Sequence, residues 1–389
     1  MHRLGYTMKN RGELIASLIS VALYFLALQF IASIIARYSR DLGIDIASTS
    51  IVWSSLFLVS FILRPMVGYI ADRISSYFTM CIGSVFLVGA SIAYLASNSF
   101  SELLIGRVVQ GIGNAFFISP SIAAVATAAG DYAGIALGMR STIIAISGIV
   151  APPIAGTIVD SLGYYPVVLI AITLSASASI LNGIKYRSRY VRKLDSSKSL
   201  GWRDAINRVV VVSFIAALAS GGVFLTISGL LQSHYRDLGY GASIYGYFYM
   251  IFGISSTVSR LLAGSLASKK NPAKIAIVGH TIVALSMAML SKMYTIPLSY
   301  VVAIVYGIGI GLTIPTQQLL VISSVSPYVR NRAIAIYAMG FDLGGFIAPI
   351  IFGYYIAANY GYDISYGCIA ILPLIAITSL VYVVKKKQY

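Results

Sequence analysis

Long apolar segments follow one another along almost the whole sequence, each long enough to cross a lipid bilayer. A spanning α-helix needs about 20 predominantly apolar residues. The 389 residues are 58% hydrophobic and only 10% charged, whereas a soluble domain carries about 25% charged residues. So few charges do not cover a water-exposed surface, but they suit a bilayer, where lipid-facing side chains are apolar. We therefore expect an all-α membrane protein.

The apolar segments number twelve, and most breaks between them carry turn residues or charges. We expect spanning helices at 14–36, 48–72, 78–97, 102–127, 134–159, 164–184, 206–232, 242–267, 273–291, 296–321, 331–357 and 362–384.

Lysine and arginine are distributed unevenly over the loops between these segments. With the N-terminus in the cytoplasm, 21 of the 28 lie on the cytoplasmic side, four on the opposite side and three inside helices. Short basic loops stay in the cytoplasm. The sequence therefore predicts that both termini are cytoplasmic, which requires an even number of spans.

The second half of the sequence repeats the first. With a shift of 196 residues, the tetrapeptide at 40–43 recurs identically at 236–239, and further identities continue along five helices. Because this shift is half the chain length, six spans fall in each half, which predicts two parallel six-helix bundles. We expect the bundles at 1–184 and 206–389, joined by a basic cytoplasmic linker at 185–205 that lies at the lipid head groups.

A glycine, an acid and a base close the second expected helix. The stretch from Arg64 to Ser75 resembles the G-x-L-A-D-R-x-G-R-R signature of the major facilitator superfamily. The matching positions are Gly68, Ala71, Asp72 and Arg73. The resemblance implies a cytoplasmic gate, in which Gly68 allows close helix approach, Asp72 accepts hydrogen bonds from a helix N-terminus and Arg73 pairs with Asp131. The alternative is a loop turn with a surface ion pair that contributes little.

The fourth expected helix carries an arginine in an apolar setting. The run Arg107-Val108-Val109-Gln110-Gly111-Ile112-Gly113-Asn114 resembles the R-x-x-Q-G-x-G motif of drug:proton antiporters. Arg107 and Asn114 share one helix face. The resemblance implies that Arg107 faces the central cavity and serves proton coupling or anion contact. The alternative is an arginine held structurally by backbone carbonyls.

The fifth expected helix contains glycines and two adjacent prolines. Gly148, Pro152, Pro153 and Gly156 lie in a stretch that resembles the G-x-x-x-G-P-x-x-G-G motif of antiporters. Proline removes a helix hydrogen bond and bends the helix, so this segment is expected to seal or flex the pathway between the bundles. The eleventh helix contains a similar step, which leaves plain architecture as the alternative.

Asp342 is the one acid deep inside an apolar segment. Its distance from the start of the eleventh helix puts it near the midplane, where transporters bind substrates or protons. The Asp-Leu-Gly step also resembles that of efflux permeases of the same superfamily. We expect Asp342 either to exchange protons or to form an ion pair with Arg107 or Arg260.

Further polar residues are candidates for the lining of a transport cavity. Arg260 resembles an arginine of monocarboxylate and oxalate–formate transporters, but Arg64 has the same place in the repeat, and duplication alone explains both. Tyr249 shares a face with Arg260, and Gln29 and Gln317 are cavity candidates by position.

The resemblance to the major facilitator superfamily covers nearly the whole chain. It implies a secondary active transporter that moves a small organic solute by alternating access, with proton-coupled efflux as the leading hypothesis and an organic-anion or monocarboxylate porter as the alternative. Without a metal-ligand cluster, nucleophile motif or phosphate-binding loop in the sequence, we expect no enzyme, no metal and no cofactor, with the proton as coupling ion.

The expected partners are the small-molecule substrate and the lipid bilayer. Despite a net charge of +16, the bases lie in short loops, so nucleic-acid binding is not expected. A monomer, multi-pass in the plasma membrane of a prokaryotic cell, is expected. Arg107 and Asp342 are the best functional candidates, because alanines stand at their repeat positions, 303 and 145.

Overall fold

The computed structural model describes residues 8–187, 202–267, 271–326 and 329–385. All regular elements in these ranges are helical, with no strand among them, so the predicted all-α class is confirmed. The α-helices are α1 (Met8–Ala32), α2 (Ile35–Asp41), α3 (Ile46–Arg73), α4 (Ser76–Ala96), α5 (Phe100–Ala129), α6 (Ala133–Leu162), α7 (Tyr164–Arg187), α8 (Arg208–Asp237), α9 (Ala242–Ala267), α10 (Pro272–Leu290), α11 (Leu298–Ser323), α12 (Arg330–Tyr355), α13 (Gly361–Ile369) and α14 (Ile371–Lys385).

Ten segments of the described residues are long and apolar enough to cross a membrane. The last of them, Arg332–Val384, contains both of the final two expected helices. Helix α9 is not among the ten, although its bounds coincide with the expected range 242–267. Its tyrosines, serines and Arg260 lower its mean hydropathy.

The first and last expected helices are each split in two, so the prediction of continuous helices was wrong there. Helix α1 ends at Ala32 and α2 starts at Ile35. Between them the Ser33 hydroxyl donates to the carbonyl of Phe30, 3.1 Å away, a contact that bends helices. Pro373, the third residue of α14, has no N–H to donate to the carbonyl of Ile369 at the end of α13, which interrupts the helix between them.

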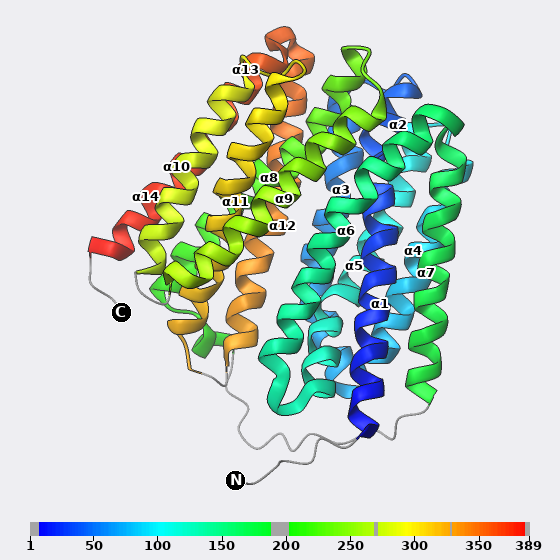
Figure 1. Cartoon of the computed structure of the whole chain (residues 1–389), viewed down its shortest axis with the longest axis vertical. Coiled ribbons are helices and arrows are strands. Elements are labelled where there is room, and N and C mark those ends of the chain that lie inside the picture. The colour runs from blue at the N-terminus through cyan, green and yellow to red at the C-terminus, as the bar shows by residue number, and fades with distance from the viewer. Residues whose placement is uncertain (1–7, 188–201, 268–270, 327–328, 386–389) are drawn as a thin grey trace.

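Most of the long helices run roughly along one axis (Figure 1). Helix α1 rises from the lower end of the view to α2 at the upper end, and α14 descends from α13 at that same upper end. We call the end that carries α2 and α13 the distal end. The opposite end, where α1 begins, is the proximal end.

Buried apolar side chains gather in two large clusters. One is formed by residues from Leu18 to Ala178, and the other mainly by residues from Val223 to Ile369. Helices α1–α7 meet α8–α14 chiefly through two pairs, α3 with α12 and α6 with α9. These two contacts position the residues of the candidate site.

Candidate functional site

An ion pair between α3 and α12 forms the centre of the candidate site. Asp342 is the thirteenth of the 26 residues of α12, and it is only 6% exposed. The Nε of Arg64 donates to its Oδ2 over 2.5 Å. A buried charge is tolerated when a partner neutralises it. The pair therefore holds a carboxylate at mid-helix and joins the two groups of helices.

The predicted partner of Asp342 was wrong. The sequence suggested Arg107 or Arg260, but Arg64 makes the contact. The reason is the pairing of helices, because α3 packs against α12, whereas Arg107 lies on α5 and Arg260 on α9. The residue pattern along one helix does not reveal which other helix packs against it.

Arg107 is 1% exposed and lies in the contact between α5 and α3. Its guanidinium donates to the backbone carbonyls of Val52 (3.2 Å) and Trp53 (2.6 Å) and to the side chain of Gln110 (2.8 Å). It also lies 4.8 Å from the centre of the Trp53 ring. These contacts match the structural alternative, an arginine held by backbone carbonyls.

Asn114 is bound to a neighbouring helix and not to Arg107. The hydroxyl of Tyr24 on α1 donates to Asn114 Oδ1 over 2.9 Å. The Tyr24 ring stacks on Phe117 with centroids 3.7 Å apart. Arg107 and Asn114 thus take part in two separate helix contacts, α5 with α3 and α5 with α1.

Arg260 differs from Arg64 and Arg107 in its hydrogen-bond partners. Its Nε is buried and finds no hydrogen-bond acceptor among the described residues. Tyr249 lies eleven residues before Arg260 on the same helix, a separation of about 16 Å along the axis. The centroid of its ring lies 5.4 Å from that of Phe252. The two residues share α9 but do not form one site.

The two predicted glutamines have different surroundings. Gln317 is fully buried, with its Nε2 2.6 Å from His280 Nε2 and its Oε1 accepting from Tyr337 over 3.0 Å. It therefore belongs to an enclosed network inside α8–α12. Gln29 is half-buried on α1 and lies beside Gly148 of α6.

The glycine–proline segment of α6 forms the contact with α9. A Cβ on Gly156 would lie 2.6 Å from the carbonyl oxygen of Ala242, and a Cβ on Gly246 would lie 2.6 Å from that of Pro152. Pro153 is equally close to Gly246. Only glycine permits such close approach of two backbones, so this motif holds α6 and α9 together.

The predicted cytoplasmic gate cannot be placed at the level of side chains. Gly68, Asp72 and Arg73 belong to α3 and Asp131 to the short 3-10 turn Gly130–Tyr132, but their side chains lie outside the described residues. The same holds for most of the predicted linker, 188–201. In the described part of the chain, His, Cys, Asp and Glu side chains form no group suited to a metal ion.

Two reciprocal ion pairs close the distal end. Arg40 pairs with Asp237 at 3.1 Å, and Arg236 pairs with Asp41 at 2.7 Å. We call these four residues the distal clasp. They are the first two residues of each copy of the repeated tetrapeptide. The recurring arginine and aspartate were therefore visible in the sequence, but the sequence did not show that the two copies pair with each other.

A carboxylate of α6 caps the start of α9, which sequence analysis also missed. Asp160 accepts hydrogen bonds from the backbone N–H groups of Ala242 (2.6 Å) and Ser243 (2.9 Å). A Cβ on Gly241 would lie 2.6 Å from Asp160 Oδ2, so glycine makes room for the carboxylate. Under the 196-residue shift Gly241 corresponds to Asp45, which caps α3 from within its own chain segment.

Sequence comparison places this arrangement among known proteins. The family model for the Major Facilitator Superfamily matches residues 17–349. "Multidrug resistance protein MdtG" of Enterobacter lignolyticus is 22% identical over 350 residues, which cover 86% of this chain and 83% of the relative. The protein of the same name from Yersinia enterocolitica is 22% identical over 371 residues, covering 90% and 87%.

Solved structures share the fold. A bacterial homolog of the human lysosomal transporter Spinster, inward-facing and unoccupied, superposes with a TM-score of 0.73 at 14% identity, covering 98% of this chain and 96% of that one. A mutant of the nucleoside transporter NupG gives 0.73 at 16% identity, covering 96% and 99%. The chain belongs to the Major Facilitator Superfamily, and it is a multi-pass membrane transporter and not an enzyme.

Proposed function

We propose that this chain is a secondary transporter that exports a small amphipathic organic solute in exchange for protons. It works by alternating access between two six-helix bundles, 1–184 and 206–389, with the linker 185–205 and both termini in the cytoplasm. The 196-residue repeat, the uneven basic loops and the two clusters of buried apolar residues support this layout. The curated relatives named for multidrug resistance support export. The chain acts as a monomer in the plasma membrane of a prokaryotic cell.

The ion pair between Arg64 and Asp342 carries the proposal. Its carboxylate lies at mid-helix of α12, and the pair joins α12 to α3. Protonation of the carboxylate would remove its charge and release Arg64, which weakens one link between the bundles. Burial of an ionisable pair inside spanning helices costs free energy, and a role in proton relay would explain why the pair is present.

Further contacts between the bundles support a state that is closed at the distal end. The distal clasp, the Asp160 cap and the α6–α9 glycine contacts all lie between Arg64–Asp342 and the distal end. With cytoplasmic termini, the distal end is the outer one. Solute would then enter from the cytoplasm and leave after the clasp opens.

Proton coupling is tested with Asp342→Asn in liposomes. A thermal-shift screen of lipophilic amines and small carboxylates selects the solute, and substrate-driven proton release is then followed. We expect Asp342→Asn to bind the solute but to release no protons, because an amide does not exchange a proton here. Asp45→Asn, outside the spans, serves as control, since asparagine caps a helix equally well. Undiminished proton release by Asp342→Asn would falsify the proton role.

A second candidate is an organic-anion porter, favoured by the unpartnered Nε of Arg260. A carboxylate substrate would supply the missing acceptor through a charge-assisted hydrogen bond. Arg260→Gln should then abolish transport of carboxylates and leave lipophilic amines unaffected, while Arg260→Lys retains part of it. An equal loss for both classes of solute would exclude this assignment.

A further inference from the structure

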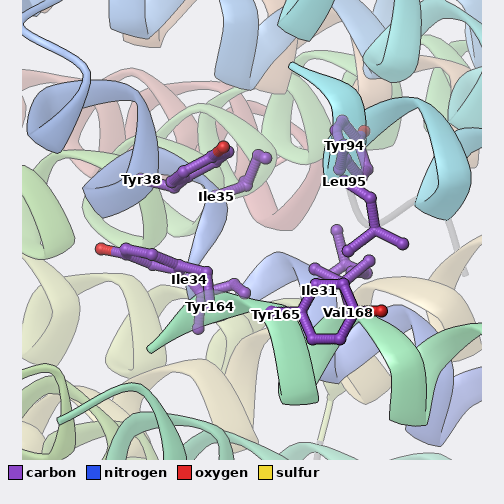
Figure 2. Close-up of a pocket in the computed structure, with 9 residues that line it drawn as sticks. All are labelled: Ile31, Ile34, Ile35, Tyr38, Tyr94, Leu95, Tyr164, Tyr165 and Val168. Atoms are coloured by element: carbon purple, nitrogen blue, oxygen red, sulfur yellow. The ribbon is translucent and has the colours of Figure 1, made fainter. Parts of the chain in front are cut away.

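A cavity of about 110 Å³ lies at the distal end, away from the Arg64–Asp342 pair. Figure 2 shows the side chains around it, which come from α1, α2, α4 and α7. Its walls are aliphatic side chains together with the rings of Tyr38, Tyr94 and Tyr164. Tyr165, also in the lining, is 63% exposed, so the cavity opens to the surroundings beside it.

The three enclosed tyrosines direct their hydroxyl groups to other partners. Tyr38 donates to the backbone carbonyl of Ser97 (2.7 Å), Tyr94 to the side chain of Gln110 (2.7 Å), and Tyr164 to a carboxylate of the distal clasp. The cavity therefore meets ring faces and aliphatic groups. A water molecule needs several polar partners, whereas an apolar guest is favoured by walls of this kind.

The second half of the chain contains a matching arrangement. The ring of Tyr38 corresponds to that of His234 under the 196-residue shift. Tyr38 packs on Tyr164 with centroids 4.6 Å apart, and His234 stacks on Tyr362 at 4.1 Å. Like Tyr164, Tyr362 donates its hydroxyl to an aspartate of the distal clasp. The two sets of residues therefore have the same architecture.

What fills the space differs between the halves. Four residues after Tyr362 comes Tyr366, whose fully buried ring packs 5.6 Å from His234, with its hydroxyl 3.0 Å from His234 Nδ1. Four residues after Tyr164 comes Val168, which lines the cavity instead. Helix α7 thus lacks the phenol ring that α13 carries four residues after its clasp-bound tyrosine.

The helix that carries these rings also differs. In the second half α8 runs unbroken from Arg208 to Asp237, whereas in the first half the chain breaks between α1 and α2, at the wall of the cavity. The break and the shorter side chain of Val168 together leave the space empty of protein.

We propose that this cavity is a binding site for one six-membered aromatic ring of a small amphipathic molecule, with the ring in the place that Tyr366 takes in the second half. An engineered apolar cavity of about 150 Å³ holds benzene, and this smaller cavity is open on one side, where a polar substituent leaves beside Tyr165. A ring bound here contacts Tyr164 and so stabilises the closed distal clasp. The site does not depend on the direction or coupling of transport.

The decisive variant is Val168→Tyr, which introduces the ring that the second half already has. The probe is 4-fluorophenol, observed by fluorine NMR with the full chain in nanodiscs, and protein-free nanodiscs correct for partitioning into lipid. Filling the cavity should weaken binding by about tenfold or more, which corresponds to a loss of about 1.4 kcal/mol. Leu169→Tyr, on the neighbouring exposed position, adds the same side chain outside the cavity and should leave binding unchanged.

A second variant decides the question if Val168→Tyr does not fold. Val168→Ala enlarges the cavity, so affinity for 2-naphthol should rise relative to that for 4-fluorophenol. The proposal is overturned if both phenols bind Val168→Ala in the same ratio as the unmodified chain. It is also overturned if Val168→Tyr folds and binds 4-fluorophenol as strongly as the unmodified chain does.

Discussion

Arg64 and Arg260 hold the same position in the two halves of the repeat but meet different surroundings. Arg64 on α3 pairs with Asp342 of α12. Arg260 lies on α9, which packs against α6 and α11, and its Nε has no acceptor in the described part of the chain. At the repeat position of Asp342, α6 carries Ala145. The two repeat positions thus carry the same residue type, and among the described residues only Arg64 pairs with a carboxylate.

This difference distinguishes two otherwise equivalent helix contacts. Helix pairing is the same in both, since α3 meets α12 as α9 meets α6. At this contact the change is one acid, which gives Arg64 a carboxylate partner and leaves the Nε of Arg260 without an acceptor among the described residues. A buried donor atom without an acceptor costs free energy, and binding of an anion or a polar solute group at Arg260 Nε would offset that cost.

The largest expected effect comes from breaking the pair. Arg64→Leu or Asp342→Leu should each lower the free energy of unfolding by about 3–5 kcal/mol, because the remaining partner is left as an uncompensated buried charge. The double variant should lose less than the sum, since no charge is left unpaired. Unfolding of the purified protein in SDS, with all four members of the cycle, measures the coupling.

Arg260→Leu is the matched control for this cycle. It removes the same residue type at the equivalent position, but no acid loses its partner. We expect the free energy of unfolding to change by about 1 kcal/mol or less, because the loss of side-chain packing is offset by removal of an unsatisfied buried donor. Equal destabilisation by Arg64→Leu and Arg260→Leu would contradict the difference between the halves.

Supplying the missing acid should make the halves more alike. Ala145→Asp gives α6 the carboxylate that α12 has, and repeat symmetry places it opposite Arg260. We expect a coupling of about 2 kcal/mol between the new aspartate and Arg260, within the range of contacting residues. It is measured by comparing Ala145→Asp in the unmodified chain and in the Arg260→Gln background. Equal effects in both backgrounds would show that the two positions do not meet.

The helix positions were largely predictable from the sequence, because each span must be apolar over its length. The bounds of α9 coincide with the prediction, and the acid of the buried pair was identified as the one acid deep inside an apolar segment. The break after Ala32 was not predictable, since no proline or glycine marks it and only the Ser33 contact accompanies it.

Contacts between helices far apart in the sequence were the part that sequence could not provide. Arg107 and Arg64 are both arginines in apolar segments, and nothing local shows that one meets carbonyls and the other Asp342. The residues of the distal clasp could be recognised in the sequence, because the same charges recur in both halves. Its crossed pairing depends on how α2 packs against α8, which is a property of the folded chain.

Removal of the cap that crosses between the halves should have a moderate effect. Asp160→Ala deprives α9 of a carboxylate that accepts two backbone hydrogen bonds. Because Asp160 is exposed, we expect a loss of only about 1–2 kcal/mol in the free energy of unfolding. The variant should also open the distal end, since the cap joins α6 to α9. Faster labelling of a cysteine introduced at Ser243 would report this opening, and an unchanged labelling rate would argue against a latch.

The smallest effect is expected at the equivalent cap of the first half, Asp45. Its carboxylate accepts a hydrogen bond from the backbone N–H of Ser48 at 2.9 Å, and Asp45→Ala should lower the free energy of unfolding by about 1 kcal/mol without opening the distal end.

Partial burial raises the pKa of Asp45, but hydrogen bonds from Ser48 and the neighbouring backbone outweigh this effect and lower the pKa overall. A lowered pKa in the folded state means that this stabilisation is fully present above the pKa of the unfolded chain and is lost as pH falls through the folded value. Melting temperatures of the unmodified chain and Asp45→Ala should therefore differ at neutral pH and converge in acid. A difference that persists in acid would show that the cap acts without its charge.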